Sequence, residues 1–336
     1  MSAPRTKERD ALHITNGDSA AGVIQDTGLT GAALSWRDVL HEGPVPPGLS
    51  LAELRPVRAR FIAEAGWGAF DAVLAEFAAR DRALESALAY AEIVLWFEHD
   101  LYDQLQLLQL LDWFAERDLG ATRLSLVCGS EYLGLSTPER LRERYLGRQP
   151  ISATQLALGQ TAWAAFRSPD PRALVDLLGQ DTSALPFLAA ALWRHLQEFP
   201  SIANGLSRSE SQALEAIARG VTRLDELYVA AHHEREQAIF LSDAVFAWSM
   251  EGLSREREPC VGSADGGSLA AQGQGSRAFW SRHVTLTQFG QAVLDGAADR
   301  VAVNGIDRWR GGVHLHGPRA RWRWDNGARR LREGAC

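Results

Sequence analysis

Lysine is almost absent from this chain of 336 residues, because Lys7 is the only lysine among 35 lysines and arginines. We interpret the excess of arginine, together with abundant alanine, as a coding bias and not as a binding signal. The formal net charge of −7 argues against a protein that coats nucleic acid. The composition therefore predicts an ordinary globular protein that is long enough for two or three domains.

Cysteine is also scarce, and Cys128, Cys260 and Cys336 lie far apart in the sequence. An odd number of isolated cysteines argues against a disulfide framework or a thiolate zinc site and fits a reducing cytoplasm. No apolar run approaches the length of a membrane span, and the N-terminal MSAPRTKERD lacks the apolar core of a signal sequence. We therefore expect a cytoplasmic protein without a membrane partner, beginning with a disordered tail at residues 1–10.

The first half of the chain alternates apolar strands with amphipathic helices. Strands are expected at 11–15, 31–36, 92–97 and 123–129, and helices from residue 19 or 20 and at 51–88, 103–118 and 136–147. The segment EIVLWF is apolar except at its first residue and partly β-branched, as in a strand buried on both faces. This alternation is typical of a parallel sheet wrapped by helices. We therefore predict an α/β fold, with a Rossmann-like domain at residues 11–150.

The second half is predicted to contain three further parts. Residues 151–204 show only helical patterns and form a helical connector. In residues 205–298, three short helices precede two strands around a low-complexity loop at 263–276, which is the order of a winged-helix-like domain. Residues 299–336 alternate apolar and polar residues between glycine turns, which predicts a β tail made of hairpins.

Polar residues follow each of the four expected parallel strands. They are Asn16, Gly17, Asp18 and Ser19 after the first strand, Asp38, His41 and Glu42 after the second, Glu98, His99, Asp100 and Asp103 after the third, and Ser130 and Glu131 after the fourth. Ligands of open parallel sheets bind beyond the carboxyl ends of the strands. We therefore expect these side chains to converge on one site at the strand-end rim.

The residue types at this rim suggest a polar small molecule, such as a nucleotide or a phosphoester. The predicted catalytic residues are Glu98, His99, Asp100 and His41. A carboxylate–imidazole pair can do acid–base work or position a metal-bound water, so the chain could be a metal-dependent hydrolase. A divalent metal could bind to Asp18, His99 and Asp100. The predicted ligand-binding residues are Asn16, Gly17, Asp18, Ser19, Asp38, Glu42, Ser130 and Glu131.

Structural roles compete with these functional ones. Asp100 could simply cap the helix that follows it. Asp103 lies in the first turn of that helix, where the helix dipole favours an anion whatever the function. His99 could be a hydrogen-bonded core histidine. Helix capping does not explain Glu98 or His99, so these two residues are the first to test.

The C-terminal half suggests an alternative, a ligand-responsive regulator that binds DNA. Its expected second helix, TRLDELYVAA, carries Asp225 and Glu226 with one arginine, whereas a recognition helix should be more basic. In the tail, the pattern RWRW favours tryptophans packed inward over a nucleic-acid stacking platform. His314 and His316 share a strand face, but without an evident third metal ligand we expect exposed histidines.

Five phrases of the sequence carry a resemblance to a known family. They are LHITNGDSAAGVI, WRDVLHEGPVP, LWFEHDLYDQLQLLQLL, FPSIANGLSRSE and NGIDRWRGGVHL. Together they resemble a bacterial family defined as a domain of unknown function, the 1835 type, over nearly the whole chain. The resemblance implies a single intracellular bacterial protein and implies no activity, fold or catalytic residue.

Overall fold

The computed structural model describes residues 9–266, 269 and 277–334. The chain divides into two compact units, Met1–Ala63 with Gly68–Leu192 and Glu64–Trp67 with Trp193–Cys336. Residues 1–8 of the predicted tail and most of the loop at 263–276 lie outside the described residues. The predicted connector at 151–204 is divided between the two units. Within the described part of the chain, no helix is long and apolar enough to cross a membrane.

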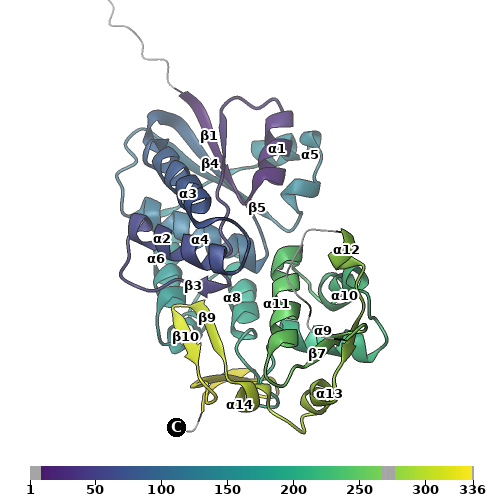
Figure 1. The fold of residues 1–336 in the computed structure, drawn as a ribbon. Helices are drawn as coiled ribbons and strands as arrows, with labels where there is room; N and C mark the ends of the chain where they lie inside the picture. The colour runs from purple at the N-terminus through teal and green to yellow at the C-terminus, as the bar shows by residue number, and fades with distance from the viewer. Residues whose placement is uncertain (1–8, 267–268, 270–276, 335–336) are drawn as a thin grey trace, which may run out of the picture. The chain divides into compact units, whose positions relative to one another are not determined.

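The first unit is a mixed α/β structure around one sheet (Figure 1). Its elements are β1 (Arg9–Thr15), α1 (Asp18–Asp26), β2 (Ala32–Ser35), β3 (Gly43–Pro44), α2 (Leu51–Glu64), α3 (Phe70–Glu85), the 3-10 helix η1 (Ala87–Ala89), β4 (Tyr90–Glu98), α4 (Leu101–Ala115), β5 (Arg123–Gly129), the 3-10 helix η2 (Leu133–Leu135), α5 (Pro138–Leu146), β6 (Gln149–Pro150), α6 (Ala153–Arg167) and α7 (Arg172–Leu178). Helix α8 (Leu188–Leu196) spans the division between the units.

The sheet has the strand order β2-β1-β4-β5-β6. The first four strands are parallel, as the sequence predicted, and β6 pairs antiparallel with β5. The edge strand β6 is too short for any hydrophobic pattern to reveal it. In the centre, β4 is buried on both faces. Val94 and Trp96 pack towards α1 and α5, and Figure 1 shows α3 on the opposite side of the sheet.

Helices α4 and α6 pack closely, so the residues of α6 belong to the first unit. Gly159 of α6 makes this approach feasible, because a Cβ at that position would lie only 2.4 Å from the Cβ of Leu111 on α4. A Cβ atom has no freedom to rotate away. The glycine therefore determines how near the two helices come.

The described residues of the second unit form short helices and three antiparallel strand pairs. Its elements are α9 (Arg208–Ala218), α10 (Leu224–Tyr228), the π-helix η3 (Val229–His233), α11 (Asp243–Arg255), β7 (Val261–Ser263), α12 (Arg277–Trp280), β8 (Val284–Leu286), α13 (Gln288–Leu294), α14 (Arg300–Asn304), β9 (Asp307–Gly311), β10 (Val313–His316), β11 (Trp322–Asp325) and β12 (Arg330–Glu333). The pairs are β7 with β8, β9 with β10, and β11 with β12.

The order of α9, α10, α11, β7 and β8 matches the three helices and two strands that the sequence predicted. Their apolar side chains form one core, in which Leu214, Leu227, Phe246 and Val284 are buried. The predicted β tail is also present. Its tryptophans Trp322 and Trp324 are buried, which confirms the inward packing predicted from RWRW.

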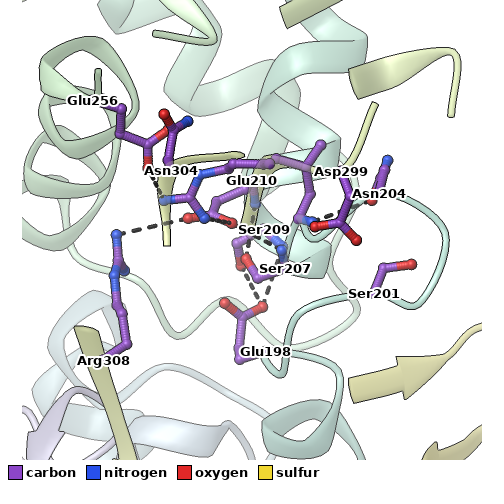
Figure 2. A network of polar contacts seen from close by, with 12 residues as sticks. Glu198, Ser201, Asn204, Ser207, Ser209, Glu210, Glu256, Asp299, Asn304 and Arg308 are labelled. Atoms are coloured by element: carbon purple, nitrogen blue, oxygen red, sulfur yellow. Dashed lines mark hydrogen bonds and ion pairs between the residues drawn. The ribbon is translucent and has the colours of Figure 1, made fainter. Parts of the chain in front are cut away.

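Buried carboxylates in the second unit are neutralised by arginines (Figure 2). Glu198 accepts from Arg194 Nη1 at 2.5 Å and from Ser209 Oγ at 2.8 Å. Burial would raise the pKa of Glu198, but Arg194 and the other adjacent donors hold it far below the usual range. Glu210 caps α9 and lies 3.3 Å from Nη1 of Arg300. Hydrogen bonds through Ser209 therefore link α8 to α9, and the pair of Arg300 with Glu210 links α9 to α14.

Replacing Gly159 with alanine should destabilise the first unit. The added Cβ would overlap Leu111, and overpacking of this kind costs about 1–3 kcal/mol. Gly22→Ala in α1 is the matched control, because a Cβ there meets no atom within 4 Å and alanine favours a helix by up to about 1 kcal/mol. Urea denaturation followed by circular dichroism measures both changes. Equal free energies of unfolding for the two variants would contradict the close packing of α4 and α6.

Candidate functional site

The winding of the sheet changes direction between β1 and β4. The chain forms β2 on one side of β1 and then crosses to form β4 on the other side. In open α/β sheets, ligands bind at the carboxyl ends of the strands at such a switch point. Asn16 directly follows β1, and Glu98 is the last residue of β4. These two residues therefore lie at the position that the topology favours for a ligand.

Three carboxylates gather at the turn between β4 and α4. Glu98, Asp100 and Asp103 are all buried, and each offers an oxygen within 4.8 Å of the others. Asp100 caps α4 by accepting from the backbone N–H of Asp103 at 3.1 Å. In return, Asp103 Oδ1 accepts from the backbone N–H of Glu98 at 2.7 Å. The strand end and the helix start thus hold the carboxylates together.

Neutral donors from two other loops complete this turn. The side-chain amide of Asn16 donates to Glu98 Oε1 at 3.1 Å and to Asp103 Oδ2 at 2.8 Å. The backbone N–H of Leu133, in the loop after β5, donates to Glu98 Oε1 at 2.6 Å. The Tyr102 hydroxyl donates to the carbonyl of Asn16 at 3.2 Å. The loops after β1, β4 and β5 are therefore joined through the carboxylates.

Burial changes the acidity of all three groups. It raises the pKa of Asp100 to about 7, with a smaller contribution from the nearby Glu98 carboxylate. Burial also raises the pKa of Glu98, and it raises that of Asp103 well above the usual range. Adjacent carboxylates in a desolvated site cannot all be ionised without a compensating positive charge. Burial therefore favours the protonated forms of these carboxyl groups, and the positive charge of Arg144 opposes this effect on the pKa of Glu98.

The two predicted catalytic histidines lie in aromatic surroundings. His99 is half-buried, with its ring centroid 5.6 Å from that of Tyr132 and 6.0 Å from that of Phe187. His41 is buried, and its ring centroid lies 6.1 Å from that of Tyr102. Tyr102 in turn contacts Asn16. His41 is thus connected to the carboxylates indirectly, whereas His99 lies between two of them in the sequence.

Several predicted rim residues have other partners. Asp18 is exposed and forms an ion pair with Arg37. Asp38 is buried, and its carboxylate accepts hydrogen bonds from Nε of Arg58 at 3.1 Å and from Nη2 of Arg58 at 2.8 Å. Glu131 is exposed and forms an ion pair with Arg140 at 2.7 Å. These contacts satisfy the three carboxylates without a ligand.

The remaining rim residues are placed near the ends of the strands without joining the carboxylates. Ser19 is exposed and lies close to Gly134 in the segment after β5. A Cβ added at Gly134 would lie only 2.6 Å from the Oγ of Ser19. Gly17 precedes α1, and Ser130 is exposed. Glu42 is buried, and its carbonyl accepts from Arg58 at 2.8 Å.

Of the predicted metal set of Asp18, His99 and Asp100, Asp18 forms an ion pair with Arg37, and Asp100 lies beside two other carboxylates. The oxygens that come together belong to Glu98, Asp100 and Asp103. Asp103 was expected at the rim but not among the metal ligands, although it is the most buried of the three. The spacing of Asp100 and Asp103 in the sequence indicates that their side chains lie close together. The capping residue and the third residue of a helix both lie at its N-terminus.

Comparison with known proteins assigns no family. No family model matches the chain, and a search of curated proteins finds no significant match. The functional argument therefore depends on the geometry of the strand ends.

Asp100→Asn should alter the dependence of stability on pH. Because the folded pKa is raised, Asp100 contributes stability that is fully present below about pH 4 and is lost as the pH rises towards about 7. Asparagine keeps the helix cap and never ionises. In the presence of a chelator, the free energy of unfolding of the variant should therefore gain on the order of 4 kcal/mol over that of the natural chain between about pH 4 and about pH 8. Urea denaturation at several pH values in this range measures the free energy of unfolding of both proteins. A constant difference between them at all pH values would contradict the raised pKa of Asp100.

Proposed function

We propose that the first unit binds a polar small molecule at the switch point, together with a divalent cation held by Glu98, Asp100 and Asp103. The observation that carries this proposal is the meeting of three buried carboxylates where β1 and β4 end. Hydrogen bonds to the three carboxylates come from neutral donors. Arg144 lowers the pKa of Glu98, but a single arginine does not balance three carboxylates, so the cluster favours a further cation. An all-oxygen ligand set suits Mg²⁺, Mn²⁺ or Ca²⁺.

The proposed fold of this unit is Rossmann-like, which favours a nucleotide or phosphoester as the ligand. A parallel sheet with helices on both faces and a crossing beside β1 is the arrangement in which such ligands bind. Three carboxylates would repel a phosphate directly. A cation removes this conflict, because it neutralises the carboxylates and attracts the phosphate oxygens. The cation and the ligand therefore belong to one proposal.

A hydrolytic reaction is the chemical version of this proposal. His99 lies between two of the proposed cation ligands and is half-buried among aromatic rings. An imidazole in that position can accept a proton from an attacking water. Asn16 and Tyr102 would position Glu98 and Asp103, because they hold the loop after β1 against the carboxylates.

The family resemblance is consistent with this location. The phrases LHITNGDSAAGVI and LWFEHDLYDQLQLLQLL contain Asn16 and all three carboxylates. We propose membership of that family on these phrases, and we propose an intracellular bacterial protein with it.

The DNA-binding alternative has weaker support. The proposed winged-helix-like domain in the second unit has the right order of elements. However, Arg223 at the start of α10 is held in ion pairs with Asp225 and Glu226 of the same helix. An arginine paired in this way offers little net charge to phosphates.

Glu98→Gln and Asp103→Asn should abolish cation binding. Both changes keep the shape of the side chain and remove a charged oxygen ligand. Chelator-treated protein should show a higher melting temperature when Mn²⁺ is added. When the free Mn²⁺ concentration is one hundred times the dissociation constant, the free energy of unfolding should increase by about 2.7 kcal/mol. Each variant should lose most of this increase in melting temperature. Both variants should still melt cooperatively without the metal.

Glu143→Gln is the matched control, because Glu143 is an exposed partner of Arg140 on α5. It should respond to Mn²⁺ as the natural chain does. Native mass spectrometry of freshly purified protein tests the ligand, since a phosphorylated small molecule should be retained by the control and lost from Glu98→Gln. A Mn²⁺ response that persists in both site variants would place the cation elsewhere.

A further inference from the structure

A second group of potential metal ligands lies on the β9–β10 hairpin of the second unit. Asp307, His314 and His316 each offer one ligand atom, and these atoms all lie within 4.8 Å of one another. Asp307 Oδ1 lies 2.6 Å from His314 Nε2, and Asp307 Oδ2 lies 3.8 Å from His316 Nδ1. The sequence showed the two histidines without a third ligand, and the pairing of the strands supplies it.

The register of the β9–β10 hairpin explains why Asp307, His314 and His316 lie close together. His316 lies directly opposite Asp307, and His314 lies opposite Trp309. Because side chains alternate along a strand, these four residues share one face of the hairpin. The opposite face buries Val313 and Leu315. The fixed inner face therefore keeps the ligand residues turned towards solvent.

One of the ligand rings is held in place before any metal binds. The imidazole of His314 stacks on the indole of Trp309, with ring centroids 4.4 Å apart and ring planes 3° from parallel. The stack restricts rotation of the ring that presents Nε2 to Asp307. Preorganisation of this kind lowers the entropy cost of binding.

We propose that Asp307, His314 and His316 form a site for a divalent transition-metal ion such as Zn²⁺. Imidazole nitrogen with one carboxylate oxygen is a ligand set that suits zinc, nickel and copper better than magnesium or calcium. Ligand atoms around one tetrahedral zinc ion lie about 3.3 Å apart. The observed separations bracket this value, so small rotations of exposed side chains bring all three atoms onto the metal.

Three protein ligands leave a coordination position open. Asp307 and His316 also line a hollow of the second unit, together with Trp248, Asn304 and Arg308. Two of the three proposed ligands thus border this hollow, and the exposed site leaves the remaining position to water. The site differs in chemistry from the all-oxygen cluster of the first unit, and each proposal can fail without the other.

Isothermal titration of the full chain with ZnCl₂ tests the site. The protein is stripped with chelator and measured in excess Mg²⁺, which occupies oxygen-ligand sites. The natural chain should bind one equivalent of Zn²⁺ saturably. His314→Ala and His316→Ala should each weaken this binding at least tenfold, and Asp307→Asn should weaken it severalfold. Circular dichroism should show unchanged folding, because all three side chains are exposed.

His283→Ala is the matched control, because His283 is an exposed histidine of the same unit. This variant should bind Zn²⁺ as the natural chain does. With Cu²⁺ as the probe, electron paramagnetic resonance should show two coordinating nitrogens in the natural chain and one in His316→Ala. The absence of saturable Zn²⁺ binding, or unchanged affinity in both histidine variants, would overturn the proposal.

Discussion

The desolvation of three carboxylates at the end of β4 is the constraint on which the first unit depends. Removing a carboxylate from water is costly unless hydrogen bonds or an opposite charge replace the hydration. Here the replacements are a backbone N–H of the same turn, the amide of Asn16 and the backbone N–H of Leu133. Because these donors belong to loops after three different strands, satisfying the carboxylates also fixes the rim of the sheet.

Two other buried carboxylates of the chain have arginine partners. Asp38 is paired with Arg58, and Glu198 is paired with Arg194, so each charge has a charged partner. These pairs hold elements together and need nothing from outside the protein. Glu98, Asp100 and Asp103 instead accept their hydrogen bonds from neutral donors, although the two groups look alike in the sequence.

The sequence predicted the parallel strands and put Asn16, Glu98, Asp100 and Asp103 after their ends, but it did not predict which rim carboxylates form ion pairs. The apolar run of β4 and the alternation of strands and helices required only local patterns. The ion pair of Asp38 depends on Arg58 of α2, and that of Asp18 depends on Arg37, so tertiary packing decided both. The amide of Asn16 reaches Glu98 only because β1 and β4 are neighbours in the sheet. No local pattern encodes these distances.

The arginine network of the second unit has a consequence for how this half of the protein can change over evolution. Arg310 of β9 donates to the carbonyl of Glu198, and Arg300 of α14 pairs with Glu210 at the start of α9. A chain that lost α14 and the strands after it would retain Glu210 without Arg300, and breaking a buried ion pair costs about 3–5 kcal/mol. Helix α9 and the C-terminal segment therefore depend on each other for stability, so an exchange of either part alone would leave Glu210 or Arg300 without its partner.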